Sequence, residues 1–422
     1  MISSTLLRPW GGSRFKAWLF LVSALFLSSL LWTERGTGTP AHVIGPHVVS
    51  SDSIRLRKIR EIDGAFGGLT NLAVDINGYI YVTDVVNQEI KAFSLDGRLL
   101  HTIGRKGQGP GEFTGLLDLA ISRDSLYAFD NNLKRISVYH ISDTPKLEYT
   151  ISVLQAGRGQ ILNYGILALQ SGGVLAQVVP LTDPEHSEGR TITLREINRS
   201  GVTAAPPVLS VPDNEWLITT DRSYGYSVSP MPFGRKSFFQ IGAGDQVYHV
   251  RTDQPVVQVY SLDGRRIRTL SVPAERISVT SADLANLRRS YVEYIGPQAS
   301  ELVFGRIQRA YESGQLPKFK PFFKDFVLES SGRIWLRLVN NQDRLASTPV
   351  GLVYRTSGGA GSSSSWLVIS PDGRPIGTAT VDGDIQLHVV RDGRAYGIST
   401  DELGVHRIIV FEIAGMRVSG RN

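Results

Sequence analysis

The chain contains no cysteine among its 422 residues. This absence excludes disulfide bonds, thiolate metal sites, cysteine nucleophiles and the lipid-bearing cysteine of a bacterial lipoprotein. It does not assign a redox compartment, because a bacterial envelope protein can also lack cysteine. Cysteine chemistry is thereby removed from the functions that this chain can perform.

Motifs for familiar reaction types are also missing. The eight histidines form neither HxxxH nor HExxH spacing, so zinc-hydrolase chemistry is not indicated. No GxSxG nucleophile motif is present. The Gly-rich stretches 104–111 and 358–365 are not followed by a helix start, so neither is predicted to cradle a phosphate. No catalytic residue can be assigned from motifs.

A strong excess of one charge is absent as well. Lysine and arginine number 45 and aspartate and glutamate 39, which leaves a net charge of +6. There is no dense basic run, so a dispersed, solvated surface is favoured over a nucleic-acid groove. Nucleic acid is therefore not an expected partner.

What the chain does contain is one short strand pattern in six copies. Each copy begins with a turn residue and continues with alternating side chains, and five of the six end on an aromatic residue. The copies are residues 78–81, 124–127, 172–175, 245–248, 332–335 and 393–396. Such a repeat indicates one supersecondary unit that cannot bury its apolar face alone, so the copies must pack on each other.

A second marker follows the first at a regular offset. Residues 94–98, 261–265 and 370–374 each read Ser, any residue, Asp, Gly, Arg. Asp-Gly predicts a tight turn, because glycine accepts positive φ and aspartate can bond its own backbone. Each unit therefore reads as strand, glycine turn, aromatic strand, loop, third strand, Asp-Gly turn and fourth strand, which is a four-stranded antiparallel meander.

Six such units predict an all-β fold, a six-bladed β-propeller of four-stranded antiparallel blades over residues 54–415. The N-terminal strand 54–62 has no unit of its own. We expect it to be the outer strand of the last blade, beside 407–413, where it would close the ring. The alternative is two stacked β-domains or a sandwich, which six in-phase copies disfavour.

At this point the chain resembles a known family. Residues 103–113, between the first two predicted blades, are similar to the Gly-rich linker of NHL-like six-bladed β-propellers, a family with bacterial, exported members. Residues 72–84 followed by 90–93 resemble a full NHL repeat. The resemblance spans about residues 69–140 and fades further along. It implies the fold but no single function, because such propellers serve as binding scaffolds, lyases and lactonases.

The N-terminus carries an export signature. Arg8, Arg14 and Lys16 precede the apolar run 17–32, as in a basic n-region before an h-region. No clean small-x-small cleavage site follows, so both a cleaved signal and a retained membrane anchor stay open for residues 1–35. Residues 36–53 read as a linker. The propeller is expected outside the cytoplasm, either periplasmic or anchored in the cell membrane.

Residues 278–316 interrupt the strand rhythm. Thr280, with Asp283 three residues on, predicts a helix start, and apolar residues then recur at helical spacing. Pro297 should end this helix, and a second should begin at about Ser300. The segment is therefore predicted as a helical hairpin inserted between blades 4 and 5. It could cap one mouth of the propeller or contact a partner, or its apolar face could simply pack on the rim.

Three other segments are predicted to be irregular. Residues 223–231 carry Tyr224 and Tyr226, which could suit a carbohydrate or peptide surface, although an ordinary surface loop is favoured. The Gly- and Ser-rich stretch 358–365 is expected to be a flexible loop in blade 5. Residues 416–422 read as a tail.

The central channel is the expected place for chemistry. Aligning the innermost strands on the repeat puts polar residues at similar depth in four blades, with Gly165 and Phe238 in the other two. The four are Asn71, Asp118, Asp325 and Gln386. A divalent cation such as Ca or Mg could bind Asp118 and Asp325, or ordered water could occupy the same space. His388, slightly further along the last strand, is a candidate base or ligand, with a structural role as the alternative.

Two aspartates outside the channel have a simpler interpretation. Asp84 and Asp130 end the aromatic strands of the first two blades at equivalent repeat positions. Equivalent positions in a repeat point to turn hydrogen bonds and not to catalysis.

Two function hypotheses follow. The first is an extracytoplasmic binding or scaffold module that recognises a protein, a peptide or a glycan at a channel mouth or at the rim, with no cofactor expected. The membrane would be a further partner through 17–32 if that segment is retained. The alternative is a metal-dependent lyase or lactonase-type hydrolase with Asp118 and Asp325 as ligands in the channel.

Overall fold

The computed structural model describes residues 53–153, 160–180, 189–202, 206–221, 225–295, 297–339, 363–401 and 403–414. The predicted signal or anchor, the linker up to residue 52 and the tail 416–422 lie outside these residues. Among the helices that are described, none is long and apolar enough to cross a membrane.

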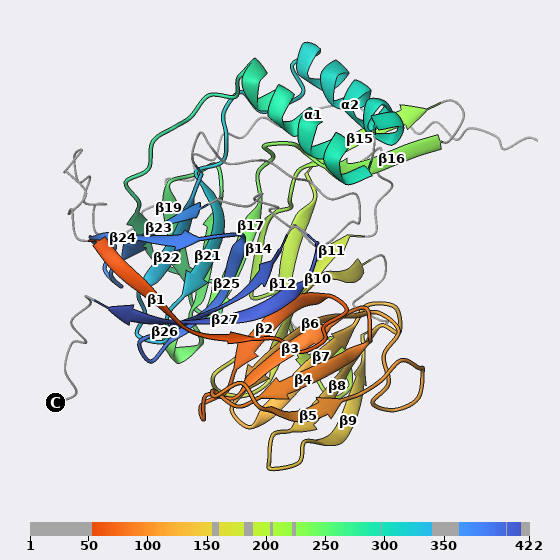
Figure 1. Ribbon diagram of the computed structural model, residues 1–422, viewed down its shortest axis with the longest axis vertical. Coiled ribbons are helices and arrows are strands. Elements are labelled where there is room, and N and C mark those ends of the chain that lie inside the picture. Colours follow the sequence, from red (N-terminus) through yellow and green to blue (C-terminus); the bar gives the residue numbers. More distant parts are fainter. Residues whose placement is uncertain are drawn as a thin grey trace, which may run out of the picture. The chain divides into compact units, whose positions relative to one another are not determined.

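The first three blades follow one another along the chain (Figure 1). Blade 1 consists of β2 (Leu69–Val74), β3 (Ile80–Asp84), β4 (Glu89–Phe93) and β5 (Leu99–Ile103). Blade 2 consists of β6 (Leu116–Ser122), β7 (Ser125–Asp130), β8 (Arg135–His140) and β9 (Lys146–Ser152). Blade 3 consists of β10 (Gln160–Ala168), β11 (Val174–Pro180), β12 (Thr191–Asn198), β13 (Gly201–Val202) and β14 (Leu209–Pro212). Blade 3 differs from the others because two short strands, β13 and β14, both pair with β12.

The remaining blades keep the four-stranded plan. Blade 4 consists of β17 (Ser237–Ile241), β18 (Val247–Arg251), β19 (Val256–Tyr260) and β20 (Arg266–Ser271). Blade 5 consists of β21 (Phe323–Leu328), β22 (Ile334–Leu338), β23 (Ser363–Ile369) and β24 (Pro375–Asp382). Blade 6 consists of β25 (Ile385–Arg391), β26 (Arg394–Thr400), β27 (His406–Ala414) and β1 (Ser53–Ile62). The chain is therefore the predicted six-bladed β-propeller.

The N-terminal strand closes the ring, as predicted. β1 pairs antiparallel with β27 from Arg55 opposite Ala414 to Ile62 opposite Ile408. Its first two residues also pair with β24 in parallel, which joins blades 5 and 6 into one eight-stranded sheet. The last blade thus takes its outer strand from the other end of the chain.

Six hydrophobic cores hold the described blades together, one at each interface between neighbours. The core between blades 6 and 1 combines Tyr396 of β26 with Val82 of β3, so the ring is closed by packing as well as by pairing. The core between blades 5 and 6 contains Trp335 and Trp366, both fully buried. Each blade is therefore covered on both faces, which explains why its middle strands are apolar at nearly every position.

The repeated aromatic residue has a constant role. In β3, Ile80 and Val82 join the core shared with blade 6, whereas Tyr81 joins the core shared with blade 2. The same division occurs in β22, where Trp335 faces blade 6 and Ile334 faces blade 4. Because side chains alternate along a strand, the marker aromatic always packs against the following blade.

The Asp-Gly turns also form as predicted. Gly97, Gly264 and Gly373 all have φ between +80° and +91°, the region that favours glycine. In each turn the serine hydroxyl donates to the backbone carbonyl of the arginine, at 3.0 to 3.1 Å. These turns set the register between the third and fourth strands.

The insertion between blades 4 and 5 is a helical hairpin, as predicted. α1 (Ser281–Ile295) begins at a reciprocal cap: the Thr280 N–H donates to the Asp283 carboxylate at 2.9 Å, and the Asp283 N–H donates back to the Thr280 hydroxyl. α2 (Pro297–Glu312) begins at Pro297 and not at about Ser300. Proline lacks the N–H that a first helical turn leaves unpaired, so it starts the second helix instead of only ending the first.

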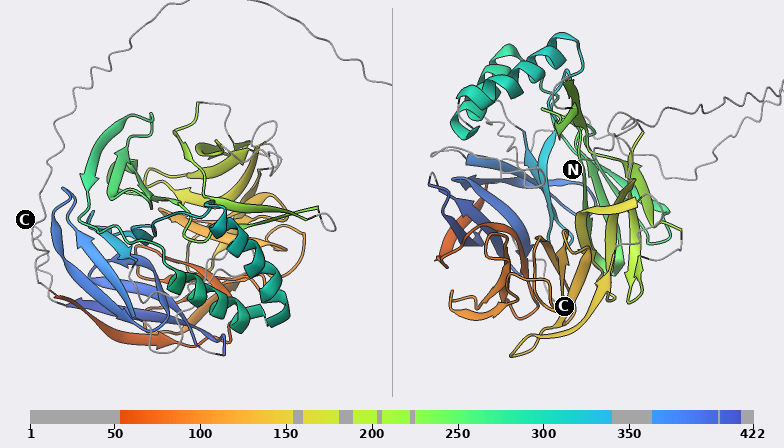
Figure 2. Two further views of the ribbon diagram at one scale, coloured as in Figure 1. Left: turned by 90° about the horizontal axis from the view of Figure 1, so that it is seen from above. Right: turned by 90° about the vertical axis from the view of Figure 1, so that its right-hand side faces the viewer.

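One predicted loop is a strand. Residues 225–230, expected to lie in a surface loop, form β16 (Gly225–Pro230), which pairs with β15 (Trp216–Asp221) in the connection between blades 3 and 4. The helices pack on this connection: Leu284, Leu287 and Ile307 share a small core with Leu217 and Phe233. Figures 1 and 2 show the helices and the hairpin together beyond the strand ends of the ring. We call this unit the cap layer (residues 215–235 and 278–320).

The structure also describes parts of the two Gly-rich segments. The Ser-rich end of 358–365 enters β23, which begins at Ser363, while residues 358–362 lie outside the described part. The Gly-rich linker 104–111 is held in place, because Arg135 donates to the backbone carbonyls of Gln108, Gly109 and Glu112.

Candidate functional site

The polar residues predicted to line the channel occupy one level of the innermost strands. Their partners on the second strand of the same blade lie two residues beyond the marker aromatic. The pairs are Asp118–Phe129, Asp325–Arg337, Gln386–Ile398 and, in blade 4, Phe238–Val250. In blade 1 the Asn71 N–H donates to the Thr83 hydroxyl at 3.0 Å, and Thr83 is likewise two residues beyond Tyr81. These five positions are therefore equivalent in the fold.

Backbone irregularities gather at this level. In the described strands, five of the six innermost strands shift register here, and only β17 pairs without interruption. A β-bulge adds one residue to a strand and re-aims the side chains beside it, and bulges are common next to functional sites. The channel-lining positions, which we call the polar ring, thus lie where the blades depart from regular pairing.

One half of the polar ring is a set of hydrogen bonds that connects three blades. The Asn71 amide of blade 1 donates to the Asp118 carboxylate of blade 2. Asp118 also accepts from its neighbour Leu119 and, across the next interface, from the Ile166 N–H of blade 3, each at 2.9 Å. Burial raises the pKa of Asp118 to about 6, opposed by these donors. The absence of a side chain at Gly165 makes room for the Asp118 carboxylate. A Cβ at this position would lie 3.0 Å from the Asp118 Cγ.

The other half centres on Asp325 of blade 5. Its carboxylate accepts from the Phe326 N–H at 2.8 Å and from the Gln386 side chain of blade 6. Burial raises its pKa to about 6, opposed by that backbone donor and by the positive charges of Arg337 and Lys236. Burial in turn lowers the pKa of Lys236 to about 8. Two carboxylates and a lysine thus titrate nearer to neutral pH than usual, a feature found often at functional sites.

His388 is the extra residue of the bulge in β25. Leu387 pairs with Gly397 and Val389 with Tyr396, which leaves His388 outside the ladder. Burial lowers the pKa of the His388 imidazole to about 4, so this side chain is neutral at physiological pH. Its nitrogens have no hydrogen-bond partner among the described residues, which keeps one of them available as an acceptor for a ligand.

A metal site is only weakly supported by these groups. The described residues contain no cluster of three or more His, Asp or Glu side chains placed to hold a metal ion. Both oxygens of Asp118 already accept from N–H donors. A cation at Asp118 or Asp325 would therefore take most of its ligands from amides, backbone carbonyls and water.

Asp84 and Asp130 are turn residues, as predicted. Asp84 is fully buried and accepts from the backbone N–H groups of Gly67, Gly68 and Asn87. Asp130 makes the equivalent set of bonds one blade further on, beginning with Thr114 and Gly115. Their repetition shows that these bonds belong to the fold.

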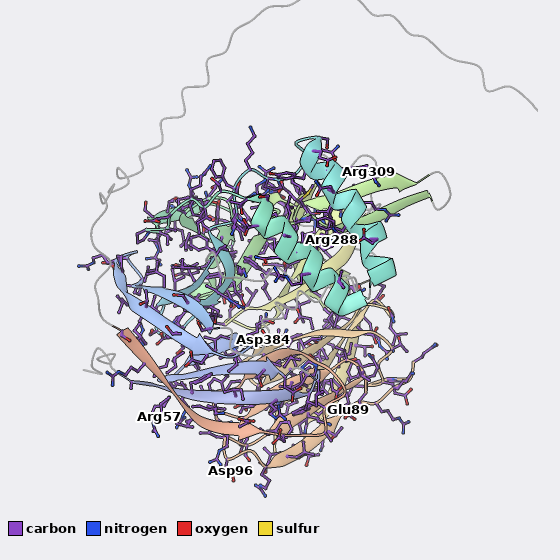
Figure 3. The ribbon with its side chains drawn as sticks, turned by 45° about the horizontal axis from the view of Figure 1, so that its top comes forward. Arg57, Glu89, Asp96, Arg288, Arg309 and Asp384 are labelled. Carbon is purple, nitrogen blue, oxygen red and sulfur yellow. The ribbon has the colours of Figure 1, made fainter. Side chains whose placement is uncertain are left out.

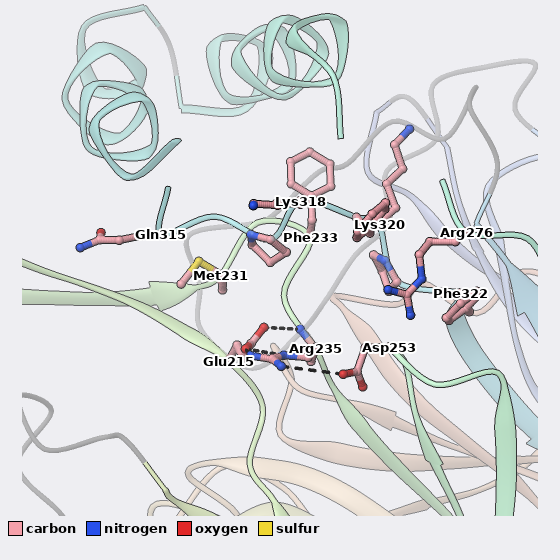
Figure 4. A pocket seen from close by; sticks show the side chains of 13 residues that line it. Glu215, Met231, Phe233, Arg235, Asp253, Arg276, Gln315, Lys318, Lys320 and Phe322 are labelled. Carbon is pink, nitrogen blue, oxygen red and sulfur yellow. Dashed lines mark hydrogen bonds and ion pairs between the residues drawn. The ribbon is translucent and has the colours of Figure 1, made fainter. Parts of the chain in front are cut away.

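A second candidate lies at the rim, where the cap layer meets blade 4. It is a pocket of about 290 Å³ between the returning segment 315–322, the 231–235 loop and Arg276 (Figure 4). Glu215, Arg235 and Asp253 form an ion-paired floor, with Arg235 and Asp253 3.8 Å apart. Above them Arg276 lies over the rings of Phe319 and Phe322 at 4.9 and 5.4 Å. We call this the rim pocket.

Sequence reasoning missed Lys236 and the whole rim pocket. Lys236 precedes its strand by one residue, so the repeat alignment of innermost strands passes over it. The rim pocket draws on five separated stretches of chain with no shared motif. Asp118 lies nine residues before its marker aromatic Tyr127, whereas Asn71 lies ten residues before Tyr81. The cause is that the β6–β7 hairpin is one residue shorter than β2–β3, as the pairs Ala120–Tyr127 and Ala73–Tyr81 show.

The comparison with family models agrees with the fold. A family model described as a 6-bladed beta-propeller matches residues 66–187, and no curated protein matches. A candidate exported protein of Bacteroides fragilis is 12% identical, with 86% of this chain and 95% of that chain covered and a TM-score of 0.47. A Bacteroides vulgatus protein is 11% identical, with coverages of 87% and 100% and a TM-score of 0.46. Virginiamycin B lyase of Staphylococcus aureus is 11% identical, with coverages of 85% and 99% and a TM-score of 0.41. These likenesses bear on no residue's role, and the NHL repeat stays a prediction.

Proposed function

We propose that this chain is an exported binding propeller that holds a protein, peptide or glycan ligand on the face carrying the cap layer. The observation that carries the proposal is the cap layer itself. Two consecutive blade connections combine into a unit with its own core, whereas the six blade interfaces are complete without it. Ordering some sixty extra residues costs conformational entropy, and the propeller does not need these residues to fold. This cost favours a role for the cap layer in recognition.

The position of the cap layer agrees with this role. Both connections run from the outer strand of one blade to the innermost strand of the next, and the polar ring lies near the start of those innermost strands. The helices that bear Arg288 and Arg309 lie well away from Arg57 and Asp96 on β1 and the blade 1 turn (Figure 3). One face of the ring thus gathers both candidate sites.

The compartment follows from the N-terminus. The basic residues Arg8, Arg14 and Lys16 before the apolar run 17–32 support export, with the propeller periplasmic or anchored in the cell membrane. A binding module fits either arrangement.

Excision of the helical insertion tests the proposal. Ser278 and Phe319 form an antiparallel bridge, so residues 279–318 can be replaced by two glycines without moving the ends. We expect the shortened chain to keep its β circular dichroism and to lose the ligands that cross-linking in intact cells recovers with the full chain.

The matched control is Ile76→Asp. Ile76 is 82% exposed in the β2–β3 turn, outside the cap layer, so its replacement should leave the recovered ligands unchanged. Recovery of the same ligands with a folded, shortened chain would contradict the proposal.

A metal-dependent lyase or lactonase in the channel is the second candidate. What favours it is the combination of His388, whose ring nitrogens have no partner in the described part of the chain, and the carboxylates Asp118 and Asp325 on one level of the channel. A bound Ca or Mg ion would polarise a carbonyl group or activate water there. His388 would serve as the proton acceptor, because its ring is held neutral.

Metal analysis separates the two candidates. We expect elemental analysis to find no stoichiometric Ca or Mg and EDTA to leave Tm within about 1 °C, since the Asp118 oxygens are already engaged by N–H donors. A stoichiometric ion with a lowered Tm would favour the enzyme, and Asp118→Ala and Asp325→Ala should then each release the ion.

A further inference from the structure

We propose that the rim pocket binds an acidic peptide segment, with a ligand carboxylate on Arg276 and Lys318 and an adjacent apolar side chain against Phe233 and Phe319. This inference rests on the proposed function, for which it names the ligand class and the place. It does not involve the channel.

The charges around the pocket leave two cations uncompensated. Arg235 is paired with Glu215 and Asp253, and Asp253 also lies 3.5 Å from Arg251. Lys320 is buried and paired with Asp283 at 2.7 Å. Arg276 and Lys318 have no carboxylate partner among the described residues, and both line the pocket. The pocket therefore carries a net positive charge that an anionic ligand can neutralise.

Arg276 is held in position before any ligand arrives. Its guanidinium lies over the rings of Phe319 and Phe322, whose negative faces attract the cation. Stacking leaves the edge of the guanidinium plane, with its fork of N–H donors, open to a carboxylate. A preorganised arginine loses less side-chain entropy on binding than a free one does.

The walls of the pocket are built on rigid supports. The bridge between Ser278 and Phe319 and the ion pair between Lys320 and Asp283 tie the returning segment to the start of α1. On the other side, the Arg235 N–H donates to Glu215 at 2.8 Å and fixes the 231–235 loop. The pocket therefore exists without the ligand, as small-ligand and peptide anchor sites commonly do.

The apolar lining favours a peptide over an anionic glycan. Phe233 and Met231 line the pocket on the side of the helix core to which they belong, and Phe319 is 42% exposed. A glutamate or aspartate next to a leucine or phenylalanine offers an anionic and a large apolar group within a few ångströms. A uronic acid chain offers the charge without the apolar side chain.

Fluorescence anisotropy with the full-length protein tests the inference. The probe is a fluorescein-labelled peptide in which glutamate and leucine alternate. The comparison peptides replace glutamate by glutamine or leucine by alanine. We expect the first peptide to bind, each replacement to weaken binding at least about tenfold, and added salt to weaken it further.

The variant pair is Arg276→Glu and Arg266→Glu. Both change the net charge equally, and Arg266 is exposed on the outer strand of blade 4, outside the pocket. We expect Arg276→Glu to weaken peptide binding at least about tenfold and Arg266→Glu to weaken it less than about twofold.

Three results would overturn the inference. They are equal binding of the glutamine peptide, equal loss in the two variants, and displacement of the probe by polygalacturonate at lower concentration than by unlabelled peptide. None of these results contradicts the proposed function if excision of residues 279–318 still abolishes ligand recovery. The peptide inference and the proposed function can therefore fail separately.

Discussion

A chain that begins at Asp63, and so lacks β1, will lose a large part of its stability, whereas a chain that begins at Ser53 will melt like the full-length protein. β1 supplies two buried side chains, Ile54 and Ile62, which are 4% and 3% exposed. Their burial is worth about 1.5–3 kcal/mol each. Native proteins are stable by only about 5–15 kcal/mol, so the loss is a large fraction of the whole. We expect Tm to fall by at least about 4 °C, because the unfolding entropy of a chain of this length is large.

The reason for the large effect is position. Ile62 lies in the core between blades 6 and 1, and Ile54 lies in the core between blades 5 and 6. Removing β1 also leaves the β27 edge without its partner. One strand therefore supports both interfaces of the closing blade.

Point variants at a buried and at an exposed position of β1 separate packing from pairing. Ile62→Asn places an amide in the core and should cost several kcal/mol, while Arg60→Asn changes an exposed residue of the same strand and should cost less than about 0.5 kcal/mol. Equal melting temperatures for the chains starting at residues 53 and 63 would refute the role of β1 in closing the ring.

Gly165→Ala will destabilise the protein by about 2 kcal/mol more than Gly173→Ala, as measured by the urea midpoint at constant m-value. Both glycines have positive φ, +112° and +89°, so both substitutions carry a backbone cost of about 1–2 kcal/mol. Only at Gly165 does the new methyl group overlap another side chain, the Asp118 carboxylate, whereas nothing lies within 4 Å at Gly173. The overlap must displace a charged acceptor from its donors, at about 1.5–3 kcal/mol per bond.

A double-mutant cycle assigns this difference to Asp118. In Asp118→Ala the carboxylate is gone, so adding Gly165→Ala should cost only the backbone term that Gly173→Ala reports. A coupling of at least about 1 kcal/mol is expected between the two positions. Equal destabilisation by Gly165→Ala and Gly173→Ala would show that the Asp118 bridge across blades 1 to 3 contributes nothing.

The extent to which the site could be predicted differs between its parts. Four channel residues could be predicted, because a repeat with constant spacing places equivalent residues at equivalent depth. They are Asn71, Asp118, Asp325 and Gln386. The special position of His388 was not, because the bulge that sets it outside the ladder has no sequence signature. The β15–β16 hairpin was missed because its pairing depends on the cap layer that it supports.

Local sequence patterns were sufficient to predict the all-β architecture, the six blades, the closing strand and the helical insertion. These features follow from local patterns: period-two alternation, Asp-Gly turns and helical spacing act between residues close in the chain. The tertiary structure alone decided that Asp118 reaches Asn71 and Ile166, that Lys236 lies beside Asp325, and that Arg276 lies over Phe319. Such contacts join residues far apart in sequence, and they depend on how bulges, blade interfaces and insertions come together in space.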